Sequence, residues 1–195
     1  MGYVQCLKSQ RAAGTLFNTY TTAKSVINPQ AICSLNPGQL KPGDTLRITA
    51  KGGISNVVTS QPTFTFQHVV GPTQPATIVV GASQAILTTT TAHTLIPFQY
   101  VATLRLDSDG SGTSAKFLYM ADVTGIMFLI SGAVGDPTLG VGELMAPATA
   151  PAVGTGFDHT VLNYLDFFVG ISVSSASNGI QIYTYFVELL SEQNG

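Results

Sequence analysis

The chain has 195 residues and a net charge of −2, and only 9 % of its residues are charged, against about 25 % in a typical soluble domain. Apolar residues make up 45 % of the chain, which is enough for a hydrophobic core and excludes intrinsic disorder. No basic run is present, and no apolar stretch approaches the ~18–20 residues that span a bilayer, so we expect neither direct nucleic-acid binding nor membrane insertion.

The shortage of charge predicts that much of the surface is covered. A monomer needs a charged coat to stay dispersed, whereas surface that is buried against partners does not. Neutral Thr, Ser, Gly, Ala and Gln fill the deficit here. We therefore expect a structural protein that packs against copies of itself and against a larger assembly.

Residues 1–40 show the least regular pattern. Residues 15–27 are compatible with one strand, and Asn28-Pro29 and residues 36–38 are typical of turns. This segment is either a first strand with a long crossover or an arm that contacts neighbours, and we separate it from a domain at 41–195. Cys6 and Cys33 are expected to be free thiols, because two cysteines do not make a disulfide framework.

Regular strand patterns begin at residue 45, where apolar Leu46 and Ile48 alternate with polar neighbours. The pattern predicts strands at 45–50, 63–69, 77–80, 98–106, 116–123, 126–130, 160–173 and 180–190, with a hairpin loop at 107–112 and a long loop at 132–157. About eight antiparallel strands without intervening helices predict an all-β, antiparallel two-sheet jelly-roll sandwich. An immunoglobulin-like sandwich is the alternative, but its usual buried Trp is missing.

The last two predicted strands are apolar on both faces. In the first of them, Phe167, Val169 and Ile171 face one way, and Leu162, Tyr164 and Phe168 face the other. In the second, strict alternation separates Ile180, Ile182 and Phe186 from Tyr183, Tyr185, Val187 and Leu189. These strands either lie at the centre of the sandwich under a covering loop, or use their second face as a subunit interface. We favour the interface, with candidate residues Tyr164, Phe168, Tyr183, Tyr185, Val187 and Leu189.

No catalytic, cofactor or metal site is expected. Asp107 and Asp109 lie in a Gly-rich loop, but the calcium loop they superficially resemble needs a terminal Glu and flanking helices. Asp158-His159 has no Gly-x-Ser-x-Gly elbow to supply a nucleophile, so a small hydrolase is disfavoured. The histidines show no metal-ligand spacing.

Several segments together resemble virion structural proteins of tailed bacteriophages. They are GDTLRITAKGGISN (43–56), GSGTSA (110–115), ATAPAVGTGFD (148–158), FFVGISV (167–173) and NGIQIY (178–183), and the resemblance covers roughly residues 40–190. It implies a jelly-roll protein on the virion, made in the host cytoplasm, that decorates and cements the outer capsid as a homotrimer bound over the major capsid protein. A tail or head-fibre component with a glycan-binding jelly roll is the alternative.

Overall fold

A computed structural model describes residues 2–57, 59, 61–88, 91–125, 128–129, 143–146 and 152–192. Within these residues the chain forms strands and two short 3-10 turns, and none of the described helices is long and apolar enough to cross a membrane. The elements are β1 (Gly2–Ser9), β2 (Phe17–Asn18), β3 (Lys24–Ser25), η1 (Pro29–Ala31), β4 (Cys33–Leu35), β5 (Thr45–Asn56), β6 (Thr63–Gly71), β7 (Ile78–Ala82), β8 (Ile86–Thr88), β9 (His93–Ser108), η2 (Gly110–Gly112), β10 (Lys116–Thr124), β11 (Phe128–Leu129), β12 (Glu143–Ala146), β13 (Ala152–Val153), β14 (Asn163–Ile171) and β15 (Gly179–Glu192).

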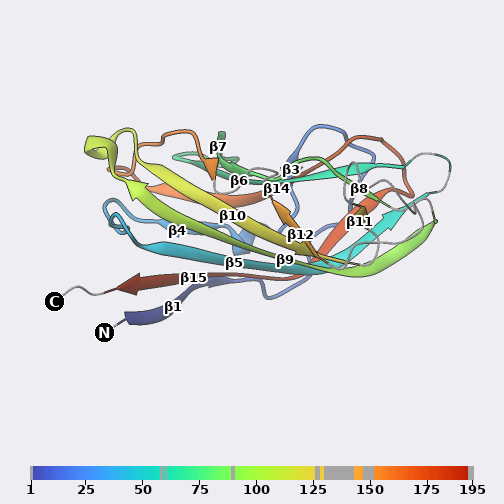
Figure 1. The fold of residues 1–195 in the computed structure, drawn as a ribbon, viewed down its shortest axis with the longest axis horizontal. Coiled ribbons are helices and arrows are strands. Elements are labelled where there is room, and N and C mark those ends of the chain that lie inside the picture. The colour runs from blue at the N-terminus through green and yellow to red at the C-terminus, as the bar shows by residue number, and fades with distance from the viewer. Residues whose placement is uncertain are drawn as a thin grey trace.

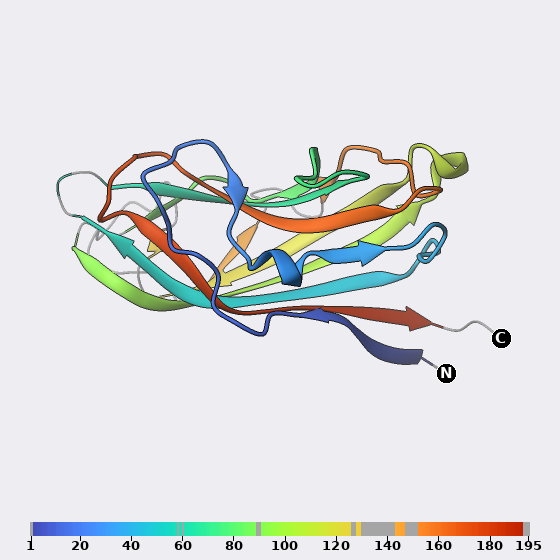
Figure 2. The same ribbon diagram turned by 180° about the vertical axis from the view of Figure 1, so that it is seen from behind.

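The described strands form two antiparallel sheets that face each other. Sheet A has the order β1-β15-β5-β9-β10-β12, with β13 added to β10 and β2 added to β15. Sheet B has the order β11-β8-β6-β14-β3, with β4 added to β14 and β7 added to β6. Figures 1 and 2 show the long strands of sheet A running along one side of the molecule, with β6 and β14 on the other side.

The connections between the sheets wrap the chain as in a jelly roll. The chain leaves sheet A at the end of β5 and enters sheet B at β6, and it returns from β14 in sheet B to β15 in sheet A. Because β5 pairs with β15 and β6 pairs with β14, the two connections run side by side from one sheet to the other. The predicted fold class, an all-β antiparallel two-sheet sandwich of jelly-roll type, is confirmed.

Most predicted strands correspond to described strands, but β5 runs on to Asn56 and β9 begins at His93, beyond the predicted 45–50 and 98–106. β9 and β10 form the predicted hairpin, and η2 closes it with Asp109 Oδ1 accepting from the N–H of Ser111. The predicted long loop at 132–157 is partly wrong, because β12 and β13 lie inside it; its remaining residues up to 151 fall outside the described part. Of the strand predicted at 126–130, only residues 128–129 are described, as β11.

Residues 2–40 supply strands to both sheets. β1 and β2 pair with β15 in sheet A, and β3 and β4 pair with β14 in sheet B. The single strand expected at 15–27 is therefore wrong, because β2 and β3 divide that segment between the two sheets. The same segment carries buried core side chains, among them Phe17, Val26 and Ile27.

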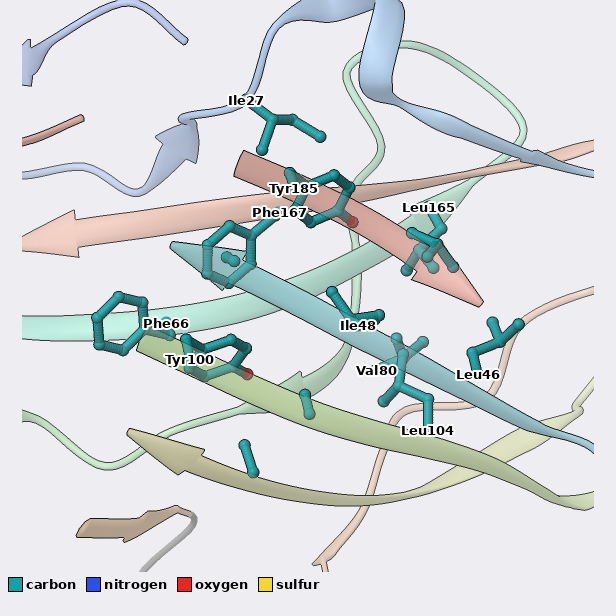
Figure 3. Packing of buried hydrophobic residues seen from close by; sticks show 14 of the residues in the cluster. Ile27, Leu46, Ile48, Phe66, Val80, Tyr100, Leu104, Leu165, Phe167 and Tyr185 are labelled. Carbon is teal, nitrogen blue, oxygen red and sulfur yellow. The ribbon is translucent and has the colours of Figure 1, made fainter. Parts of the chain in front are cut away.

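The core lies between the sheets and is rich in aromatic rings. Phe66 and Phe167 from sheet B meet Tyr100 from sheet A, with each ring centroid 5.1 Å from that of Tyr100 (Figure 3). Aliphatic side chains of β5, including Leu46 and Ile48, continue the same layer. Fully burying one such side chain contributes roughly 1.5–3 kcal/mol, so this layer holds the sheets together.

Candidate subunit interface

Three of the six predicted interface residues lie in the core of the chain itself. Tyr185 and Val187 are fully buried and Leu189 is 3 % exposed, so their side chains are not available to a second subunit. The reason is a β-bulge in β15, where the pairing with β5 shifts between Ile182 and Thr184. The extra residue reverses the alternation, so Ile180 and Ile182 point to the same side as Tyr185.

The other three predicted residues lie on two different sheets. Tyr164 and Phe168 occupy the outer face of sheet B, where both side chains are half-buried, while Phe167 and Val169 point into the core as predicted. Tyr183 lies at the bulge of β15 in sheet A and is 45 % exposed. The six residues therefore do not form one continuous surface.

Among the described residues, a group of apolar side chains outside the core lies on the outer face of sheet A, and the prediction missed it. Half-buried Leu118, Phe186 and Leu190 lie on this face, and they are not among the side chains that pack against the core. Exposed Val4 and Met120 lie on the same face. The strand register arranges these and neighbouring residues in cross-strand rows: Val4–Leu190–Thr45–Arg105–Leu118–Val153, Glu188–Arg47–Thr103–Met120, and Phe186–Thr49–Val101–Asp122.

Thr49 shows how tightly the outer face of sheet A is packed. Its register partners are Phe186 on β15 and Val101 on β9, and the threonine is only 7 % exposed although it points away from the core. Cross-strand neighbours of this size shield the side chain between them. The face is therefore partly dehydrated before any partner binds.

Two ion pairs lie on the outer face of sheet A, which also carries Asp122. The guanidinium of Arg47 donates to Glu188 Oε2 from Nε at 2.8 Å and from Nη2 at 2.7 Å. Arg105 and Asp107 form a second, longer pair at 3.5 Å. Because both pairs are partly exposed, each contributes at most about 1 kcal/mol to folding. Their larger effect is to leave the face with little net charge in its centre.

A buried polar chain crosses the core, and it has no access to solvent. His68 Nε2 lies 2.9 Å from the hydroxyl of Tyr100, which lies 2.8 Å from the hydroxyl of Tyr119. Burial lowers the pKa of His68 from 6.5 to about 3 and raises the pKa of Tyr119 to about 12. These neutral, buried side chains pack together and form hydrogen bonds between the two sheets.

Asp158 and His159, considered above for a hydrolase site, make structural hydrogen bonds. Asp158 Oδ1 accepts from the N–H and the hydroxyl of Thr160, which form a turn before β14 and lower the pKa of the Asp158 carboxyl. His159 donates its backbone N–H to Gly112 O at 2.8 Å. Cys6 is an exposed free thiol and Cys33 a buried one. Among the described residues, no three His, Cys, Asp or Glu side chains are grouped to hold a metal ion.

One groove lies at the end of sheet A where β5 ends and β9 begins. It has a volume of about 430 Å³, and its walls include Leu16, Ser55, His93, Thr94 and Ser177. Leu95, also in the wall, has a left-handed φ of 50°, and its N–H donates to Ser55 Oγ at 2.9 Å. The lining mixes hydroxyl groups with aliphatic carbon.

Comparison with known proteins gives little that bears on this surface. No protein-family model and no curated protein matches the chain. Among solved structures, one neighbour is the CBM2 module of the evolved Dit of Lactobacillus casei BL23 phage J-1, with a TM-score of 0.42 and 11 % identity over 100 % of this chain and 99 % of that one. A similarity of this size carries no argument about function, and the fold described above rests on the strand pairing itself.

Proposed function

We propose that this protein is a non-enzymatic structural protein of a tailed-bacteriophage virion, which associates with copies of itself through the outer face of sheet A. In this proposal it decorates and stabilises the capsid surface as a homotrimer bound over the major capsid protein. The sequence resemblance over residues 40–190 supports the place on the virion. The shortage of charged residues, at 9 %, supports extensive coverage by partners.

The observation that carries self-association is the group of apolar side chains outside the core. Leu118, Phe186 and Leu190 are large and half-buried, and they project away from the interior of their own chain. Burying apolar surface contributes about 25 cal/mol for each Å² removed from water, so a face of this kind gains free energy from a partner. Arg47 and Glu188 already form an ion pair, so burying them against a partner costs less than burying two separate charges.

Substitution of Met120 by Lys tests this face. Met120 is 41 % exposed on β10, so Met120→Lys leaves the core intact and places an unpaired charge in the contact. We expect light scattering to show a smaller oligomer for this variant than for the wild type. Val79→Lys is the matched control, because Val79 is 36 % exposed on β7 of sheet B. Equal oligomer in the Met120 variant and the wild type would contradict the assignment of the face.

Imaging of the phage particle tests the place on the virion. The proposal expects density for this fold above the major capsid protein on the outer shell. Density found only at the tail would contradict the capsid role while leaving self-association intact.

The groove between β5 and β9 favours a second candidate function, a glycan-binding component of a tail or head fibre. Its Ser and Thr hydroxyls and aliphatic walls suit a neutral polyol ring. A glycan array tests this candidate: reproducible hits that disappear in a Thr94→Val variant would support it, and no hit at all would remove it.

A further inference from the structure

β1 is an unusually long strand to lie at the edge of a sheet. It spans eight residues and, among the described strands, pairs only with β15, and Figures 1 and 2 show it on the outside of sheet A. Other described strands at the edges of the sheets are shorter: β3 and β11 have two residues each, β12 has four and β7 has five. Short edges protect a protein from pairing with other chains, because an edge presents unpaired N–H and C=O groups. β1 lacks this protection.

The devices that guard an edge strand are confined to the end of β1 and are missing from residues 2–6. The strand contains no Pro and a single charged residue, Lys8, which lies beyond the bulge between Cys6 and Lys8. Residues 2–6 pair with β15 in unbroken register and carry no charge. Val4, in the middle of this stretch, is 61 % exposed. Proteins that keep an edge free usually place Lys, Pro or a bulge in it.

We propose that the outer edge of β1 pairs with β1 of a second copy of this chain, antiparallel and centred on residues 2–6. Two identical strands related by a two-fold axis present complementary N–H and C=O groups to each other, which makes this an isologous contact. An uncharged stretch meets its own copy without like-charge repulsion. Val4 begins a cross-strand row of the outer face of sheet A, so the pairing extends that face from one copy into the next.

This edge contact goes beyond the proposed function, because it uses backbone groups of β1 and not the apolar side chains of the sheet. One copy can therefore use its face in one oligomer and its edge to join a neighbour. Met120→Lys, which removes the face contact, should leave the edge contact unchanged. The two proposals can thus fail separately.

Cysteine cross-linking tests the edge contact. Single thiols are compared at positions 4, 5 and 6: Val4→Cys and Gln5→Cys, each with Cys6→Ser, and the wild type with its own Cys6. Buried Cys33 is present in all three and serves as the internal reference. In an antiparallel pair of identical strands, only the residue nearest the two-fold axis lies opposite the same residue of the other copy. Residue 4 is the centre of residues 2–6, so we expect Val4→Cys to give several-fold more covalent dimer than the other two positions after mild oxidation of dilute protein.

A charged substitution in β1 provides a second test of the edge contact. Gln5 is exposed, so Gln5→Lys should leave the unfolding midpoint unchanged and lower the dimer cross-linked at the best position several-fold. Equal cross-linking at all three positions would indicate random collision, and it would overturn the proposal, as would the absence of dimer at every position.

Discussion

At the scale of single residues, His68 shows how burial links protonation to folding. Its pKa in the folded protein, about 3, lies below the ordinary value of 6.5, so the stability that depends on its neutral form is fully present above pH 6.5. That stability is lost as the pH falls towards 3, by about 1.4 kcal/mol for each pH unit in this window. Acid should therefore unfold the protein through this residue.

His68→Gln should flatten the acid limb of the stability curve. Glutamine keeps a polar partner for the Tyr100 hydroxyl but does not titrate, so its free energy of unfolding should change less between pH 6.5 and 3 than that of the wild type. Urea unfolding at a series of pH values measures this. An unchanged slope would show that His68 is accessible to protons in the folded state.

Asp166 should give a pH dependence of stability opposite in direction to that of His68. Burial raises the pKa of its carboxyl, although hydrogen bonds from Ser25 Oγ and the N–H of Phe167, both 2.7 Å long, oppose the rise. A raised pKa adds stability at low pH that is lost as the pH rises through the folded value. Asp166→Asn should remove that loss, so its stability should fall less than that of the wild type as the pH rises from below 4 towards neutrality.

Tyr183 and Tyr185 should respond differently to the same substitution. Tyr185→Asp places a charge in the core, where an unpaired ion costs several kcal/mol, so the variant should fail to fold. Tyr183→Asp alters an exposed side chain and should leave the thermal midpoint nearly unchanged. Circular dichroism on the two variants distinguishes them. Similar midpoints would contradict the direction of the β15 side chains described here.

The sequence predicted the direction of side chains where alternation is unbroken and failed where a bulge intervenes. On β14, Phe167 and Val169 point inward and Phe168 outward as expected. On β15 the bulge between Ile182 and Thr184 moved Tyr185 from the expected interface into the core. A bulge follows from the pairing with a neighbouring strand, and Thr184 carries no local signal of it.

At the scale of elements, long strands were predictable and short ones were not. β5 and β14 depend on their own alternating pattern, which is visible in the sequence. β2 and β3 contain two residues each and exist only because β15 and β14 offer edges for them to pair with. The outer face of sheet A was missed for a related reason, since Met120 and Phe186 become neighbours of other strands only through the register.

Deletion of residues 1–30 should prevent folding. The deletion removes Phe17, Val26 and Ile27 from the core, and truncating even one large buried side chain typically costs 2–5 kcal/mol. Deletion of residues 1–9 is the control and should leave a folded sandwich, because it removes only partly buried Leu7 from the described side chains that pack in or against the core. Far-ultraviolet circular dichroism and thermal melts report the outcome. A cooperative melt of the longer deletion near the wild-type midpoint would show that these strands are dispensable.

At the scale of the whole molecule, composition and surface point in the same direction. The low proportion of charge predicted covered surface, and the structure places uncovered apolar residues such as Leu118 and Phe186 on one outer face of the sandwich. The position of that face could not be predicted, because it is assembled from strands far apart in the sequence. Self-association through this face is the central claim.

The solution mass of the wild-type chain tests that claim most directly. Light scattering during size-exclusion chromatography, over a range of loading concentrations, gives the mass of the species that elutes. The account predicts a multiple of the 20.4 kDa chain mass, and three copies if the homotrimer is correct. A stable 20.4 kDa monomer at the highest concentration would contradict it.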